Sequence, residues 1–370
     1  MTPSPKNILC IRGDNMGDVI MTSPAIRALK ESLDCRITLL TSAMGGLVTS
    51  FIPGIDSTII ADLPWISAQS SPTPDNCYQL IRQLQDHHFD LAVIFTAYSQ
   101  NPLPAAFLCW MAGIPRRLAY CRENPHHLLT DWVPDKEPYS FIHHQTERDL
   151  FLVSHLGATT TDDNLHLSFS ADARHWAMVK LHAIGLDTDQ PWITLHPGVI
   201  EKKREYPIAL WIETIRLIRE QTHAQLLITG SNMDIPQAEQ LASAIPEGIY
   251  AAAGLLTIEE FIATIAASRM VVSVNTATIH IAAAVGTPQI VLYAQTNPQH
   301  MPWKARATIF EFSVDRSARS RNEVIRHVND RLYNTWSPYP TPQSIAAAVR
   351  RQLENPAKKT SHGQVADSLK

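Results

Sequence analysis

Apolar runs that suit buried strands alternate with amphipathic segments along the first half of the chain. Residues 7–11 (NILCI) and 36–41 (RITLLT) are apolar or β-branched, and residues 23–33 between them have helical spacing. Residues 89–95 (FDLAVIF) form another apolar run, which is typical of a strand covered on both faces. Alternation at this spacing predicts βαβ units and a parallel sheet.

The second half repeats this alternation. Apolar runs predict strands at residues 191–198, 224–230, 270–274 and 289–294, the last of which we expect to complete the series. Helical patterns lie between them at residues 208–221, 237–244, 258–268 and 279–286. The chain therefore contains two doubly wound units and not one long one.

These patterns predict an α/β protein with two Rossmann-like domains. We place the N-terminal domain at residues 1–175 and the C-terminal domain at residues 176–340, followed by a closing helix at 341–356 and a disordered, polar tail at 357–370. Ligands of such sheets bind outside the carboxyl ends of the strands, at the point where the strand order reverses. We therefore expect the carboxyl ends of both sheets to face a shared cleft.

Composition narrows the possible environments. A length of 370 residues suits two domains, and a net charge of −4 gives no general attraction for nucleic acid. The five cysteines form no CxxC pair, which favours a reducing cytoplasm over disulfides or a zinc site. The first residues lack the pattern of a signal peptide, and the longest apolar run, residues 105–114, is too short to span a bilayer. We interpret that run as a buried helix, with proximity to a membrane as the alternative.

The turn after the first strand carries acidic residues between glycines. Asp14 and Asp18 follow Arg12 in the segment IRGDNMGD, whose spacing matches neither a dinucleotide fingerprint nor a Walker loop. A carboxylate at a helix N-terminus stays ionised and could accept a proton from a nucleophilic hydroxyl group. Capping of the helix by Asp14 and Asp18 is the alternative.

Two segments of the second half suit anion binding. Lys203 and Arg204 follow the strand and turn ITLHPG, and cationic side chains beside backbone N–H groups can hold a diphosphate. Further on, Asn275 and Thr276 precede a helix that contains His280. The alternatives are a solvated charge run for the first segment and a structural histidine in the second.

The first turn resembles the opening motif of glycosyltransferase family 9, the ADP-heptose:lipopolysaccharide heptosyltransferases. That motif has the pattern R-x-D-x-x-G-D-V-x-x-x-x-P-A-x-x-x-L, which this chain matches at Arg12, Asp14, Gly17, Asp18, Val19, Pro24, Ala25 and Leu29. The resemblance implies that Asp18 is the base that activates the acceptor hydroxyl. It also assigns Arg12 and Asp14 to the acceptor side.

Three segments of the second half resemble family motifs in the expected order: HPG with KKREYP, ITGSNMD, and SVNTATIHIAAAVGTP. The resemblance gives Arg204 the position of the family's phosphate-binding lysine, with a catalytic role in stabilising the leaving group. Asn275 and Ala277 replace the aspartate and glycine of the family's donor signature. The expected donor-binding residues are Gly17, Gly198, Val199, Lys203, Arg204, Asp234, Leu256, Asn275, Thr276, Ala277, Thr278 and His280.

Four basic residues lie in first-half segments that also resemble the family: Arg116, Arg117, Arg122 and His143. They could meet an acidic, phosphorylated glycolipid. A solvated or structural role is the alternative.

The resemblance covers roughly residues 7–350 and implies a GT-B fold with inverting transfer of a heptose. It implies ADP-heptose as co-substrate, with no cofactor or metal, and a glycan or glycolipid acceptor such as the lipopolysaccharide core. We expect a cytoplasmic enzyme, with the inner membrane surface as a further location, and no nucleic-acid partner. A catalytically inactive nucleotide-sugar-binding relative and a nucleotide-sugar epimerase of the same architecture are the alternatives.

Overall fold

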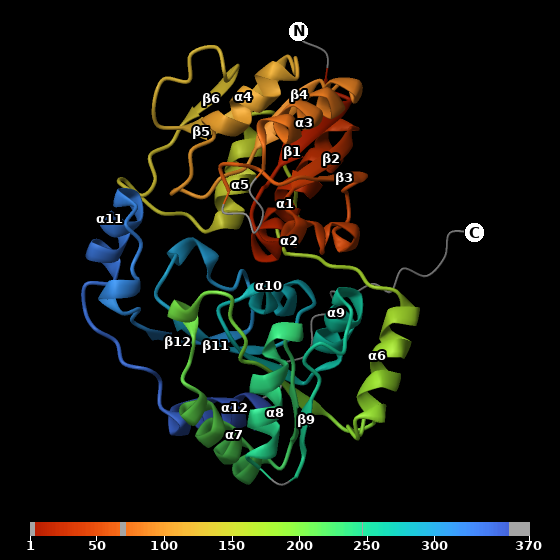
Figure 1. The fold of residues 1–370 in the computed structure, drawn as a ribbon, viewed down its shortest axis with the longest axis vertical. Helices are drawn as coiled ribbons and strands as arrows, with labels where there is room; N and C mark the ends of the chain where they lie inside the picture. The colour runs from red at the N-terminus through yellow and green to blue at the C-terminus, as the bar shows by residue number, and fades with distance from the viewer. Residues whose placement is uncertain (1–3, 67–71, 246, 355–370) are drawn as a thin grey trace. The chain divides into compact units, whose positions relative to one another are not determined.

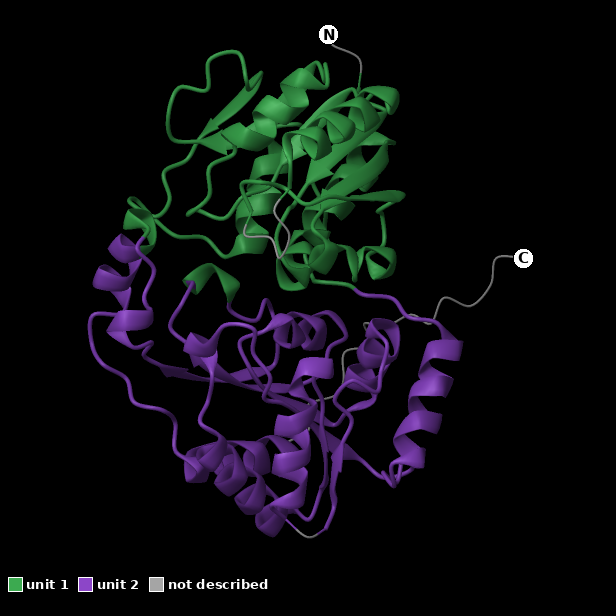
Figure 2. Cartoon of the chain, viewed as in Figure 1, with its two compact units in different colours: residues 1–166, 298–300, 322–325 green, residues 167–297, 301–321, 326–370 purple. Residues whose placement is uncertain are grey.

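A computed structural model describes residues 4–66, 72–245 and 247–354. The chain forms two compact units (Figure 2): unit 1 contains residues 1–166, 298–300 and 322–325, and unit 2 contains residues 167–297, 301–321 and 326–370. The predicted boundary at residue 175 falls inside helix α6 (Ala171–Ala183), which packs against α9 (Ile258–Ala267) within unit 2. The tail predicted to be disordered, residues 357–370, lies outside the described residues.

The sheet of unit 1 has six parallel strands in the order β3-β2-β1-β4-β5-β6. These strands are β1 (Asn7–Ile11), β2 (Arg36–Thr41), β3 (Ser57–Ile60), β4 (Leu91–Ile94), β5 (Arg116–Cys121) and β6 (Asp131–Pro134). The order reverses between β1 and β4, where Ile11 pairs with Ile94 at the carboxyl end. Side chains that follow β1 and β4 therefore border the crevice in which doubly wound sheets bind ligands.

Helices cover both faces of this sheet, with α1 packed against α5 and α3 against α4 (Figure 1). They are α1 (Met16–Leu33), α2 (Ala43–Gly46), η1 (Thr49–Phe51), α3 (Pro74–Asp86), α4 (Leu103–Met111) and α5 (Gln145–Ser154). The first helix begins at Met16, well before the predicted start at residue 23, so Pro24 lies inside it. Sequence reasoning placed the start too late because proline favours the first turn of a helix.

The interpretation of residues 105–114 as a buried helix was wrong in part. The segment is helical as α4, but Phe107 and Trp110 are 51% and 48% exposed. Their rings stack with centroids 6.0 Å apart. The helix contacts β4 and β5 with one face only, so the composition of the run did not reveal its exposed face.

Unit 2 has a second parallel sheet, in the order β12-β11-β10-β7-β8-β9. Its strands are β7 (Trp192–His196), β8 (Gln225–Ile228), β9 (Ile249–Ala251), β10 (Met270–Val274), β11 (Gln289–Ala294) and β12 (Ala307–Phe312). The winding is the same as in unit 1, with the reversal between β7 and β10. The expectation that residues 289–294 form the last strand was wrong, because β12 follows at the sheet edge, where its mixed burial hides the strand pattern.

The remaining elements belong to unit 2, except for η4 and the first residues of α11, which belong to unit 1. They are α6, η2 (Lys202–Arg204), α7 (Ile208–Thr222), η3 (Asn232–Asp234), α8 (Ile235–Ser243), α9, α10 (Ala277–Ala284), η4 (Pro298–His300), η5 (Arg316–Ala318), α11 (Glu323–Leu332) and α12 (Pro342–Glu354). The closing helix α12 packs against α7 of unit 2. Its Ile345 and Val349 are fully buried in the core that also holds Trp211.

Candidate active site

The turn between β1 and α1 brings the predicted acidic residues onto one buried cation. Arg12 is fully buried, with its Nε 3.1 Å from an Asp14 carboxylate oxygen. Its Nη2 donates a hydrogen bond to Asp18 Oδ1 at 3.1 Å. Asp18 also accepts a bond from the backbone N–H of Asn15 at 3.3 Å, so the capping contact is present. Because the Asp18 side chain is still 14% exposed, capping does not remove it from reach of a substrate.

Other polar groups surround this pair of carboxylates. His300, in the segment of residues 298–300 that belongs to unit 1, has its Nε2 3.5 Å from Asp18 Oδ1. Gln100 donates to Asp14 at 2.5 Å. Burial raises the pKa of Asp14 to about 6, although Arg12 acts in the opposite direction. Asp14 therefore becomes neutral at a higher pH than an ordinary aspartate does.

A third carboxylate, Asp149 of α5, was missed by sequence reasoning. It is 1% exposed and accepts bonds from the Thr22 hydroxyl and the Gln145 amide, both at 2.8 Å. Burial raises the pKa of Asp149 to about 6, and Arg12 partly offsets this. No sequence pattern marks Asp149, because it meets the first turns of α1 only through Thr22, which lies four residues after Asp18 on the same face of the helix.

The four predicted acceptor residues do not form one cluster. Arg116 and Arg117 begin β5 and lie at the amino edge of the sheet, opposite the edge that carries Asp18. Arg116 pairs with Asp131 at 3.0 Å. The buried Arg117 guanidinium donates to the backbone carbonyls of Leu128 at 2.7 Å and His127 at 2.9 Å. These contacts support structural roles for both arginines.

Arg122 and His143 lie beyond the carboxyl end of β5 and share a partner. Arg122 Nε donates to the backbone carbonyl of Glu137 at 3.2 Å, and the guanidinium lies 3.2 Å from the Asp135 carboxylate. The backbone N–H of His143 donates to the Glu137 side chain at 2.5 Å. Arg122 is exposed and His143 is partly buried, which keeps both as candidates for contact with an acceptor.

In unit 2, the turn after β7 is shaped by Asp234. A Cβ atom at Gly198 would lie 2.5 Å from the Asp234 carboxyl group, and one at Gly230 would lie 2.6 Å from its Cβ. Asp234 accepts bonds from the backbone N–H and the hydroxyl of Ser231, both at 2.7 Å. Only glycine at these two positions allows Asp234 to lie against the β7 and β8 turns.

The basic cluster reaches the predicted donor motif. Arg204 Nη1 donates to the backbone carbonyl of Asn275 at 3.1 Å, and its Nε lies 2.9 Å from Glu201. Lys203 Nζ also pairs with Glu201, at 3.2 Å. The structure thus brings together two segments that the sequence analysis had linked only by resemblance.

Asn275 uses its side-chain amide within the fold. Its Oδ1 accepts the backbone N–H of Ala294 at 3.1 Å, and its Nδ2 donates to the carbonyl of the same residue at 3.2 Å. A further bond from Nδ2 reaches Thr296 at 3.3 Å. An aspartate could accept but not donate, so this reciprocal pair gives the asparagine a structural reason that the sequence did not reveal.

The remaining predicted donor residues in unit 2 lie in segments that follow the carboxyl ends of its strands. Ala277 is the first residue of α10, and Thr278 and His280 are buried in its first turns. Val199 packs against the core of unit 2, and Leu256 is partly buried just before α9.

Two more predicted residues complete the set. Thr276 is the N-cap of α10, and its Oγ1 is buried without a hydrogen-bond partner among the described residues. Gly17 is buried in the first turn of α1. His196, at the end of β7, was not predicted; burial lowers its pKa to about 4, and its ring nitrogen lies 3.1 Å from the Thr229 hydroxyl.

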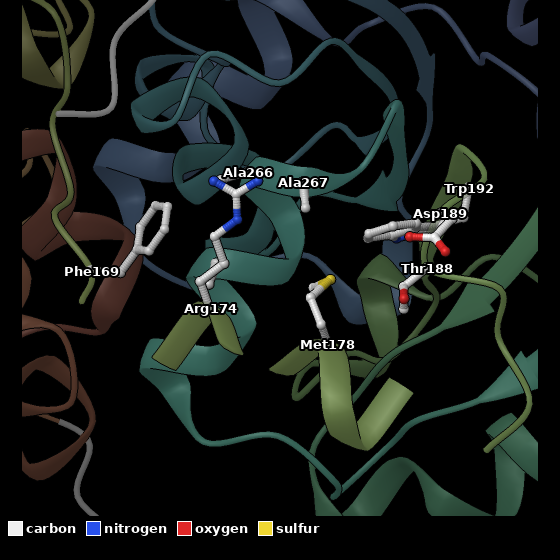
Figure 3. Close-up of a pocket in the computed structure, with 9 residues that line it drawn as sticks. Phe169, Arg174, Met178, Thr188, Asp189, Trp192, Ala266 and Ala267 are labelled. Carbon is white, nitrogen blue, oxygen red and sulfur yellow. The ribbon is translucent and has the colours of Figure 1, made fainter. Parts of the chain in front are cut away.

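A pocket of about 570 Å³ opens elsewhere on unit 2 (Figure 3). Phe169 and Arg174 border one end, and Asp189 and Trp192 border the other. Trp192 is the first residue of β7, so the pocket lies at the amino edge of the sheet. None of the predicted donor residues lines it.

No group of three or more His, Cys, Asp or Glu side chains within residues 4–66, 72–245 and 247–354 could hold a metal ion. In the same part of the chain, no helix has the length and apolar character needed to cross a membrane.

Two parallel six-stranded sheets of identical winding, with acidic and basic residues at their carboxyl edges, define a protein of two doubly wound α/β domains. The model of glycosyltransferase family 9 (heptosyltransferase) matches residues 77–329. That match covers more than half of the sequence, and the chain belongs to this family. Family membership confirms the prediction of a glycosyltransferase and does not support the epimerase alternative.

Individual relatives agree with this assignment. Lipooligosaccharide heptosyltransferase 2 of Haemophilus influenzae is 24% identical over 308 residues, which cover 80% of this chain and 85% of the relative. A family 9 glycosyltransferase structure from Veillonella parvula matches with a TM-score of 0.76 and 18% identity, over 94% of this chain and 97% of that one. ADP-heptose lipopolysaccharide heptosyltransferase II of Escherichia coli matches with a TM-score of 0.70 and 19% identity, over 94% and 98%. The predicted GT-B fold is confirmed.

Proposed function

We propose that the protein transfers a heptose from ADP-heptose to a hydroxyl group of the lipopolysaccharide core, with inversion at the anomeric carbon and Asp18 as the general base. The names of the relatives support the donor and the pathway, since they are heptosyltransferases of lipopolysaccharide or lipooligosaccharide. The observation that carries the proposal is the partly exposed Asp18 carboxylate, held by buried Arg12 beside the switch point of its sheet.

In the proposed reaction, Asp18 takes the proton of the acceptor hydroxyl as that oxygen forms a bond to the anomeric carbon. The bond from this carbon to the β-phosphate oxygen breaks at the same time, and its electron pair leaves with ADP. No metal or cofactor enters this scheme. The Asn15 N–H and Arg12 both hold Asp18, and they fix the direction in which its carboxylate can accept the proton.

The donor half of the reaction is assigned to unit 2. Arg204 and Lys203 stabilise the charge that develops on the departing diphosphate, together with the N-terminus of α10. Asp234 binds the ribose and Leu256 packs on the base. The Arg204 contact with the Asn275 carbonyl supports this assignment, because it joins the basic cluster to the turn that begins α10.

On the acceptor side, the proposal keeps Arg122 and His143 and leaves out Arg116 and Arg117. The first two lie beyond the carboxyl end of β5, on the same edge as Asp18, and are partly exposed. We place the reaction in the cytoplasm at the surface of the inner membrane, where a glycolipid acceptor would present its sugar.

A nucleotide-sugar-binding relative without turnover is the competing function, since Asn275 and Ala277 depart from the family signature. The test incubates the protein with ADP-heptose, ADP-glucose and UDP-N-acetylglucosamine, each with heptose-free core lipopolysaccharide. Thermal shift reports binding, because a ligand of the native state raises the melting temperature. Of the three donors, we expect only ADP-heptose to raise the melting temperature and to release ADP in the presence of the acceptor. A raised melting temperature without ADP release would favour the inactive relative.

A further inference from the structure

One buried arginine serves three carboxylates at the carboxyl edge of the unit 1 sheet. Arg12 contacts Asp14 and Asp18 directly, and Asp149 acts on it through its charge. Arg12 Nη1 is buried with no hydrogen-bond partner among the described residues, so Asp149 is not tied to it by such a bond. The proposed base uses Asp18 alone, which leaves the buried Asp149 without a role.

We propose that Asp149 is a positioning residue for the transfer reaction: its charge competes with Asp18 for Arg12, and its bond with Thr22 holds α1 against α5. The inference rests on the proposed function, because it concerns the strength of Asp18 as a base. Asp149 reaches neither the substrate nor the reacting atoms.

The electrostatic reason follows from the number of charges. A carboxylate paired alone with a buried guanidinium binds protons weakly and is a poor base. Each further carboxylate near the same guanidinium offsets part of its positive charge and raises the proton affinity of Asp18. Above neutral pH, Asp149 is mainly ionised, since its pKa is about 6. It then supplies this offset under the conditions of the reaction.

The geometric reason lies in Thr22. This hydroxyl lies 2.8 Å from Asp149 and 3.0 Å from the backbone carbonyl of Asp18, one helical turn earlier. Thr146 of α5 also donates to the carbonyl of Met21 at 3.1 Å. Two buried polar contacts therefore fix the first turns of α1, on which Asp18 lies, to α5.

Charged and titratable groups from several elements face Asp18 and Asp149. Asp18 faces Arg12, Asp14 and His300. Asp149 interacts with Arg12, with Arg148 on its own helix, with Cys10 on β1 and with Tyr120 on β5. Burial raises the pKa of Cys10 and of Tyr120, so both stay neutral over the pH range of an assay. Asp14 and Asp149, whose pKa values are both about 6, change charge within that range.

The test compares the pH profiles of kcat/KM for the full chain and for Asp149→Asn, with ADP-heptose and heptose-free core lipopolysaccharide. The asparagine keeps a hydrogen-bonding side chain of the same size and removes the charge. Because the pKa of Asp149 is about 6, we expect the acidic limb of the wild-type profile to contain a rise near pH 6, where Asp149 ionises, and we expect this rise to be absent from Asp149→Asn. We expect kcat on the plateau to fall severalfold, because the base is weaker, with KM for the donor unchanged.

The matched control is Asp56→Asn, which removes one charge from unit 1 at the amino edge of the sheet, where Asp56 pairs with Lys30. It should leave the acidic limb in place. A folded Asp149→Asn protein with the wild-type limb would overturn the electrostatic part of the proposal. If that variant does not fold, Thr22→Val tests the geometric part: it should lower kcat severalfold, and a wild-type kcat would overturn it.

Asp18→Asn is measured in parallel, so that failure of the proposed base can be distinguished from failure of the proposed role of Asp149. If Asp18→Asn loses turnover while Asp149→Asn keeps the wild-type acidic limb, Asp18 remains the proposed base and the proposed role of Asp149 is wrong. If Asp18→Asn keeps wild-type turnover, the proposed base and this inference fall together.

Discussion

The change Asn275→Asp restores the residue of the family signature and should nevertheless destabilise this protein. In the structure, the Asn275 amide both accepts from and donates to the backbone of Ala294, and the side chain is 5% exposed. An aspartate keeps the bond from the N–H, loses the bond to the carbonyl, and places an anion 3.2 Å from that carbonyl oxygen. The change replaces a buried donor with a buried charge.

The size of the effect follows from these two losses. A net hydrogen bond contributes about 1 kcal/mol, and an unpaired buried polar or charged group costs about 1–3 kcal/mol more. We expect the free energy of unfolding to fall by about 2–4 kcal/mol, which corresponds to a melting temperature lower by roughly 5–10 °C in a domain of this size. The deficit should shrink as the pH falls toward 4, where a buried aspartate takes up a proton and can donate again.

Thermal unfolding followed by circular dichroism measures this effect. The matched control is Asn334→Asp, the same chemical change at an exposed position of unit 2, which should shift the melting temperature by less than about 1 °C. If Asn275→Asp is as stable as the wild-type protein, the reciprocal pair with Ala294 contributes nothing. The asparagine would then have no structural explanation.

Two further predictions concern the basic cluster and the buried acids. Arg204→Ala should weaken ADP binding about tenfold in isothermal titration calorimetry. The control Arg216→Ala, which removes an exposed ion pair on α7, should bind ADP as the wild-type protein does. Equal affinities of the two variants would show that Arg204 does not bind the diphosphate. Because burial raises the folded-state pKa of Asp149 from 3.8 to about 6, its contribution favours folding at low pH and is lost as the pH rises from about 4 to 6. Asp149→Asn should therefore remove up to about 2–3 kcal/mol of pH dependence from urea unfolding over this window, and an unchanged slope would contradict the shifted pKa.

Much of the fold could be predicted because parallel strands buried on both faces leave continuous apolar runs. Strands β1, β2, β10 and β11 coincide with the predicted runs. The edge strands β9 and β12 are partly exposed, and they lack such a run. The start of α1 was missed because Asn15 and Asp18 form the helix start upstream of a proline that is usually found there.

The candidate site was predictable where one short segment carries it. Arg12, Asp14 and Asp18 lie within seven residues, and the structure joins them as one charged cluster. Asp149 could not be predicted, because only the packing of α5 on α1 brings it near Arg12. The roles of Arg117 and Asn275 likewise depend on backbone carbonyls that no sequence pattern reveals.

The most direct test of the central claim is the turnover of Asp18→Asn with ADP-heptose and heptose-free core lipopolysaccharide, measured beside the affinity for ADP-heptose. Asparagine can still accept a bond from the Asn15 N–H, so the start of α1 should persist. We expect kcat to fall about 100-fold to 10,000-fold, the range of general-base catalysis, while the donor dissociation constant changes by less than about threefold. Turnover at the wild-type rate would show that Asp18 is not the base.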